Sequence, residues 1–298
     1  MTNRILNKLS LLILFGFSFL INFGAWAQDT PMVPDFEHFY EDVTQQKLSQ
    51  LYWRLGKFDI DDDMAVDNYL RINECDIYKE YKYNQFEWNG IRKKARVYLR
   101  NNIDSFPERF KYEQPILLRE YDPETQQFEI HPRYRIDGAR KFELYSLDFY
   151  ESPCGQVSTH RIYDVEGYPN ALLLELNQPL TLTEIPVDHR IAKKYIEERM
   201  KKFLELPESR RSREAVYSFR EAYIVIKIRV FSYKGTEKIM NGRTRATVYA
   251  MLEGYEIYGD PEHEQLLHYQ NYMRKAEQTP VEVRLKEQFE ALKRKRGQ

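Results

Sequence analysis

The chain has 298 residues, and its 45 Lys and Arg nearly balance its 46 Asp and Glu, for a formal net charge of −1 at pH 7. Such a balance provides no attraction to polyanions, so the composition argues against a nucleic-acid partner. Charged residues make up 31% and aromatic residues 14% of the chain, which indicates a well-solvated surface around an aromatic core. The length allows one large domain or two smaller ones.

Residues 1–27 have the three parts of a secretory signal peptide. Two basic residues precede an apolar run over residues 9–24, and Ala-Trp-Ala follows at 25–27. This pattern predicts signal cleavage between Ala27 and Gln28. The apolar run is shorter than the ~20 residues that a spanning helix needs. We therefore expect no transmembrane anchor after cleavage, and a mature chain that is periplasmic or secreted.

Residues 28–112 are expected to form a mainly helical region. Apolar residues recur at helical spacing over 43–55, and Gly56 follows as a stop signal. A second helix is predicted over 64–81, with an aspartate as its N-cap, and a third over 85–101.

Three aspartates at alternate positions resemble the start of a calcium loop: Asp59, Asp61 and Asp63. The resemblance ends at Met64, where the loop needs glycine, and at Leu70, where it needs glutamate. The acids are therefore interpreted as a cap for the following helix. No histidine pair has the H-E-x-x-H spacing of a zinc peptidase and no glycine-rich phosphate loop is present. We expect no metal and no cofactor.

Cys75 and Cys154 are the two cysteines of the chain. An even number of cysteines in an oxidising compartment favours a disulfide. The bond would tie the helical region to the sheet that follows. Two unpaired cysteines are the alternative, because a sequence alone does not show that two thiols meet.

Residues 113–275 are expected to form an antiparallel sheet with packed amphipathic helices. The alternating patterns predict strands over 142–151, 157–164, 172–185, 222–233 and 244–258. Helices are predicted over 186–206 and 262–277, and the last segment, 276–298, is expected to be a C-terminal helix with a basic tail. Because strands follow one another as hairpins, the fold class is α+β.

One face of the strand over 222–233 carries Lys227 and Arg229 and is expected to be half-solvated, which makes it a candidate contact surface. For catalysis, the chain lacks the G-x-S-x-G and S-x-x-K patterns of nucleophilic serine enzymes. Glu74, Asp76 and Glu87 lie near aromatic residues, as in sites that cleave glycosides. Acids on a solvated helix surface are the ordinary explanation.

The segment from Leu51 to Asp59, continued to Cys75, and the triplet Phe86-Glu87-Trp88 resemble an uncharacterised family of exported proteobacterial proteins, a domain of unknown function. The resemblance implies a location in the cell envelope and carries over no catalytic residue. We therefore expect an exported, non-catalytic protein that binds an unknown envelope protein or ligand. The alternative is a periplasmic hydrolase acting on glycan or ester bonds.

Overall fold

The computed structural model describes residues 36, 38–148, 154, 165–211, 220–239 and 243–273. The predicted signal peptide, its cleavage site at Ala27 and Gln28, the strand over 157–164 and the C-terminal helix over 276–298 lie outside these residues. Within the described ranges, no helix is long and apolar enough to cross a membrane.

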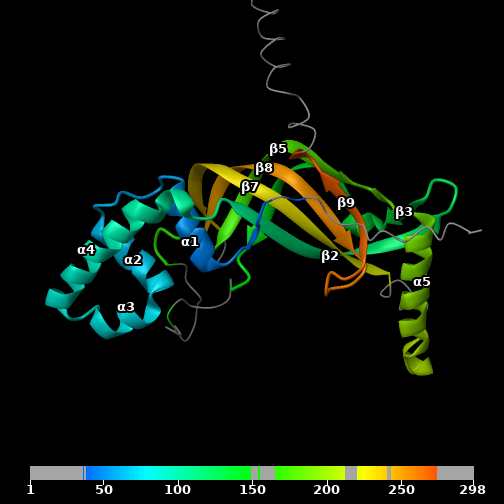
Figure 1. Ribbon diagram of the computed structural model, residues 1–298, viewed down its shortest axis with the longest axis horizontal. Coiled ribbons are helices and arrows are strands. Elements are labelled where there is room, and N and C mark those ends of the chain that lie inside the picture. The colour runs from blue at the N-terminus through cyan, green and yellow to red at the C-terminus, as the bar shows by residue number, and fades with distance from the viewer. Residues whose placement is uncertain are drawn as a thin grey trace, which may run out of the picture. The chain divides into compact units, whose positions relative to one another are not determined.

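The described part of the chain is an α+β fold, which confirms the predicted class (Figure 1). Four of its α-helices follow the two-residue strand β1, and the fifth lies between strands β6 and β7. The helices are α1 Gln45–Arg54, α2 Asp63–Asn73, α3 Cys75–Tyr81, α4 Gln85–Asn102 and α5 His189–Leu204.

The strands form one mixed sheet in the order β4-β5-β8-β7-β2-β3-β6, with β1 on β2 and β9 on β8. Most pairs are antiparallel, but β5 runs parallel to β8 and β1 runs parallel to β2, which the hairpin pattern does not anticipate. The strands are β1 Glu41–Asp42, β2 Arg109–Asp122, β3 Gln127–Ile130, β4 Ile136–Tyr145, β5 Ala171–Leu182, β6 Glu184–Pro186, β7 Glu221–Lys238, β8 Thr244–Tyr258 and β9 Leu266–Asn271.

Two predicted helices differ from the structure. The helix expected over 64–81 is broken at Glu74, whose backbone (φ −131°, ψ 54°) is not helical, so α2 and α3 are separate. The side chain of Asn73 is tied to Ser49 of α1 by a 2.8 Å hydrogen bond at this break. The helix expected over 262–277 is wrong for residues 266–271, which form β9 instead.

The turn before β9 explains the second error. The Asp260 carboxylate accepts hydrogen bonds from the backbone N–H groups of Glu264 and Gln265, at 2.9 and 2.6 Å. These bonds reverse the chain, so that β9 pairs with β8 from Leu266 onward. The hydrogen bonds of the Asp260 side chain thus favour a hairpin at this point, although the spacing of apolar residues predicts a helix.

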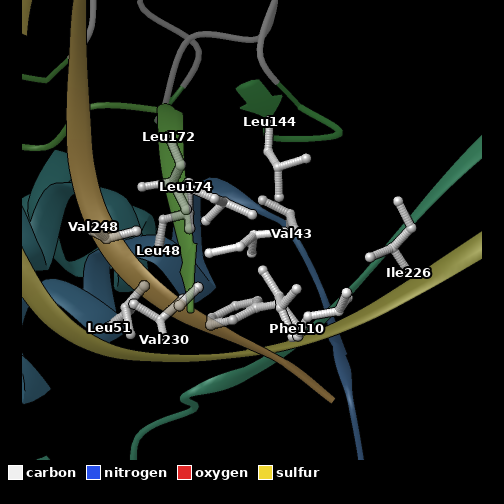
Figure 2. Close-up of a cluster of buried hydrophobic side chains, with 14 of the residues drawn as sticks. Val43, Leu48, Leu51, Phe110, Leu144, Leu172, Leu174, Ile226, Val230 and Val248 are labelled. Carbon is white, nitrogen blue, oxygen red and sulfur yellow. The ribbon is translucent and has the colours of Figure 1, made fainter. Parts of the chain in front are cut away.

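Helix α1 packs its apolar side directly against the sheet. Figure 2 shows Leu48 and Leu51 among side chains from several strands, including Phe110 and Val230. Leu48 and Leu51 are fully buried, and so is Trp53, whose Nε1 donates a 2.8 Å hydrogen bond to the Tyr168 hydroxyl. Because the buried indole N–H of Trp53 is hydrogen-bonded to Tyr168, this junction between helix and sheet carries no free-energy cost from an unsatisfied indole donor.

Candidate functional site

An apolar hollow of about 430 Å³ lies between α2, α3 and α4. Its walls are mostly aliphatic and aromatic, and its charged groups are two glutamates and a lysine. This site, the helical hollow, is lined by residues that include Tyr69, Ile77, Tyr81, Glu74, Glu87 and Lys94. Hollows of this size and apolar character are the usual form of sites that take a small molecule or an apolar side chain.

The floor of the helical hollow belongs to the core. Tyr69 of α2 is 3% exposed, and burial raises the pKa of its phenol above the usual value. Its ring lies 6.2 Å from Trp53 in an edge contact and 6.3 Å from Phe106 in a stacked one. A floor held by ring contacts on both sides is fixed in place, so the hollow is preformed on this side.

Exposed apolar side chains lie around the turn between α3 and α4. Tyr83 is 85% exposed and Phe86 is 92% exposed, while Ile77 on the wall of the hollow is 38% exposed. Large apolar groups gathered on a surface are typical of sites that bind another molecule. Tyr83 and Phe86 lie close in the chain to Tyr81 and Glu87, which line the hollow.

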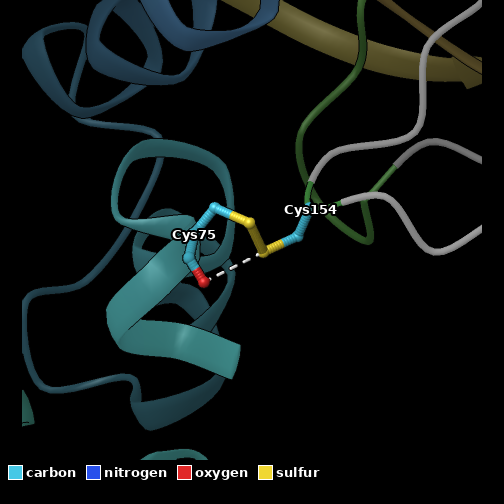
Figure 3. The surroundings of a disulfide bond; sticks show 2 residues. All are labelled: Cys75 and Cys154. Carbon is cyan, nitrogen blue, oxygen red and sulfur yellow. Dashed lines mark hydrogen bonds between the residues drawn. A yellow bond between two sulfur atoms is a disulfide. The ribbon is translucent and has the colours of Figure 1, made fainter. Parts of the chain in front are cut away.

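The wall formed by α3 depends on a disulfide. The structure contains the Cys75–Cys154 bond, with the two Cα atoms 5.1 Å apart (Figure 3). Helix α3 has seven residues, none of them buried, and such a short helix is not stable by itself. An edge contact between Tyr78 and Trp88, 5.7 Å apart, joins α3 to α4, and Tyr78 and Tyr81 are partly buried against the core. The disulfide therefore positions one wall of the hollow.

The other wall, α4, is held to α2 by a ladder of ion pairs. Arg92 pairs with Asp63 and Asp67, and Arg96 pairs with Asp63. The hydrogen bond from Arg96 lowers the pKa of Asp63. Arginines four residues apart share one helix face, which is why two of them meet the same acid.

The aspartates of the calcium-like pattern form ion pairs or a local turn. Asp63 belongs to this ladder, Asp61 is 3.5 Å from Arg100, and Asp59 accepts a hydrogen bond from the backbone of Asp61. Asp62 is the N-cap of α2, accepting from two backbone N–H groups, which confirms the predicted aspartate cap. Within the described residues no cluster of metal-binding side chains is found.

Two of the three predicted acid candidates share the helical hollow. Glu74 and Glu87 both line it and are exposed, whereas Asp76 is not among its lining residues. The neighbouring aromatics separate: Trp88 is buried and donates to Asp67, while Phe86 is exposed to solvent. The sequence therefore indicates both acids of this hollow, and of the aromatics near them Tyr81 lines it.

The predicted contact surface on β7 is wrong for Lys227. Its side chain is buried, and its Nζ lies 2.6 Å from Glu256 and 3.8 Å from the ring centroid of Phe36. Burial lowers the pKa of this amine, and the hydrogen bond to Glu256 opposes the shift. The rings of Phe36 and Tyr40 cover this amine, so only Arg229, 34% exposed, remains at the surface.

The family model of a domain of unknown function (DUF4852) matches residues 60–198. The match includes both cysteines and every residue that lines the helical hollow. It confirms the resemblance to a domain of unknown function. Comparisons with curated proteins and with solved structures gave no match.

Proposed function

We propose that this chain is an exported, non-catalytic binding protein whose helical hollow takes an apolar side chain of an envelope protein. The observation that carries the proposal is the hollow itself, with its fixed aromatic floor and the exposed Tyr83 and Phe86 beside it. An aromatic or aliphatic side chain that enters such a site supplies most of the binding energy of an interface.

The charges at the hollow indicate the chemistry of the partner. Glu74 and Glu87 contribute two negative charges, against one positive charge from Lys94. A partner segment with a basic residue next to its apolar side chain would complement the net negative charge of these three groups. The proposed occupant is therefore an apolar residue flanked by Lys or Arg in a partner protein.

Export is supported by the disulfide, since such bonds persist in oxidising compartments, and by the predicted signal peptide. Sequencing the N-terminus of the protein purified from its native cells tests export directly. The first residue is expected to be Gln28. A chain that still begins at Met1 contradicts export.

Photo-crosslinking tests the binding site. A benzophenone amino acid replaces Tyr83, and the variant is expressed and illuminated in its native cells. The same replacement at Phe39, 79% exposed but outside the hollow, is the matched control. The expected result is a protein adduct from position 83 with no equivalent from position 39. No adduct at 83, or the same adducts at both positions, contradicts the proposal.

Substitutions at Ile77 show whether the hollow itself is used. Ile77→Asp places a charge on its wall, and Ile77→Val keeps the wall apolar. The adduct from position 83 is expected to fall at least ~10-fold with aspartate, the effect of about 1.4 kcal/mol of binding energy, and to persist with valine.

Glu74 and Glu87 on one hollow favour a second candidate, a hydrolase of glycan or ester bonds. Paired carboxylates are the machinery of glycoside cleavage. Nitrophenyl glycosides and esters are incubated with the mature chain and with Glu74→Gln and Glu87→Gln. Turnover that is lost in both variants favours the hydrolase, and its absence in the parent chain favours the binding protein.

A further inference from the structure

Two further hollows meet beside α1 and form a continuous groove. The first, of about 440 Å³, is lined by residues of α1 and of the start of β2. The second, of about 550 Å³, is lined by residues of β7 and of the segment that follows α1. Arg54 and Glu108 line both hollows, so the two join at this pair. Most of the residues that line the first hollow are polar or charged, and the two hollows together are called the polar groove.

The cations that line the polar groove are already paired with carboxylates. Their distances are 2.8 Å for Arg54 and Glu108, 2.8 Å for Lys47 and Glu41, 3.0 Å for Arg109 and Glu253, and 3.6 Å for Arg229 and Glu253. An anionic ligand would have to displace one of these carboxylates. The groove therefore favours an uncharged ligand.

The pair of Arg54 and Glu108 offers a donor and an acceptor side by side where the hollows meet. The two side chains are 27% and 24% exposed, so a ligand can reach them. A guanidinium only donates and a carboxylate only accepts, whereas a hydroxyl group does both. Nη1 of Arg54 also donates to the backbone carbonyls of Asp104 and Phe106, both at 2.6 Å, which fixes the guanidinium. A fixed pair of this kind loses little side-chain freedom when it binds hydroxyl groups.

Each hollow of the polar groove also has an exposed aromatic ring. Phe39 lines the first hollow and is 79% exposed, and Phe231 lines the second and is 52% exposed. The ring of Phe231 is stacked on that of Tyr249 in the neighbouring strand, with the centroids 6.3 Å apart and the planes 19° from parallel. The face of an aromatic ring is a flat apolar surface. The C–H groups on one face of a sugar ring pack against such a surface, while the hydroxyl groups around the sugar remain free to form hydrogen bonds.

We infer that the polar groove binds a neutral oligosaccharide that spans both hollows. Phe39 and Phe231 each pack against one sugar ring, and hydroxyl groups between these rings bond to Arg54 and Glu108. The inference does not depend on the function proposed for the helical hollow. Tyr98 lines both the polar groove and the helical hollow, so the test uses residues that line the groove alone.

Titration calorimetry of the mature chain with cellohexaose, maltohexaose and chitohexaose tests the inference. At least one of the three is expected to bind with a Kd below ~1 mM, and the matching disaccharide, which fills only one hollow, at least ~10-fold more weakly. Hexagalacturonate, a charged chain of the same length, is expected to bind more weakly than the neutral one. No binding of any of the three neutral chains, or tighter binding of hexagalacturonate, overturns the inference.

Phe39→Ala and Phe231→Ala test the two hollows one at a time. Both rings are more than half exposed, so thermal unfolding of the variants is expected to match that of the parent chain. Each variant is expected to weaken binding of the hexasaccharide at least ~10-fold. Phe86→Ala removes a ring that is 92% exposed and lines neither hollow, and it is expected to leave sugar binding unchanged. If Phe39→Ala or Phe231→Ala binds the hexasaccharide as the parent does, a ligand that spans both hollows is wrong.

Cross-linking from positions 39 and 83 distinguishes this inference from the proposed function. A protein adduct from position 39 would mean that the polar groove takes a polypeptide, and it would overturn the assignment of a sugar. The absence of an adduct from position 83 would contradict the function proposed for the helical hollow and would leave the sugar titration unaffected.

Discussion

The helical region and the sheet are held together in different ways. Ring contacts and ion pairs at the surface join α2, α3 and α4 to one another, a disulfide ties α3 to Cys154, and α3 buries no residue. Strands β7 and β8 pair along most of their length, and their buried charges are matched, as in Lys227 and Glu256. The helical hollow therefore has one wall, α3, that contributes no buried residue and is tied to Cys154 by a covalent bond.

Removing the disulfide is expected to have the largest effect. Cys75 and Cys154 are 79 residues apart, and the chain-entropy model gives about 4.5 kcal/mol for a loop of that length. The double variant Cys75→Ser/Cys154→Ser should show this loss in urea unfolding under oxidising conditions. Unchanged stability would mean that packing alone holds α3.

Breaking the buried ion pair of the sheet ranks second. Lys227→Met leaves Glu256 buried without its cation, which costs about 4 kcal/mol. Lys234→Met, which removes an exposed pair with Glu175, is the control and should cost much less than Lys227→Met. Equal losses in the two variants would contradict the contrast between buried and surface charges.

A smaller effect is expected at Gly254 of β8. A Cβ at this position would overlap the carbonyl oxygen of Gln270 and the ring of Phe36. Gly254→Ala should therefore displace Phe36 and cost about 2 kcal/mol, within the range for overpacking. Thermal unfolding measures the cost, and Gly90→Ala, where a Cβ meets nothing within 4 Å, is the control.

The ion pairs of the helical region should contribute least. Arg96→Gln removes a partner of Asp63, whose side chain is 58% exposed, so the loss is expected to stay below about 1 kcal/mol. The folded-state pKa of Asp63 lies below its unfolded value, so this contribution is present above pH ~4 and disappears as the pH falls through the folded-state pKa. The parent chain and Arg96→Gln should have the same stability at acid pH. A difference that persists there would contradict an ionic contribution from the pair of Arg96 and Asp63.

Strong periodicity made some elements predictable from sequence. The strand expected over 244–258 coincides with β8, and the helices over 85–101 and 186–206 correspond to α4 and α5. Strand β2 is missing from the prediction, because it contains Pro115 and many polar residues. Its stability comes from pairing with β7, more than 100 residues away.

The sites depend even more on distant partners. Glu74 and Glu87 stand out in the sequence, but the break at Glu74 decides which side chains line the helical hollow with them. Residues that act through tertiary neighbours are not visible in local patterns.

Hydrogen exchange shows most directly whether the disulfide holds the wall of the helical hollow. Parent and Cys75→Ser/Cys154→Ser are labelled for times at which β7 and β8 of the parent remain protected. We predict that the amides of α3 lose protection in the variant while β7 and β8 keep theirs. Protection of α3 that survives without the disulfide, or a loss shared equally by all elements, would contradict this role of the bond.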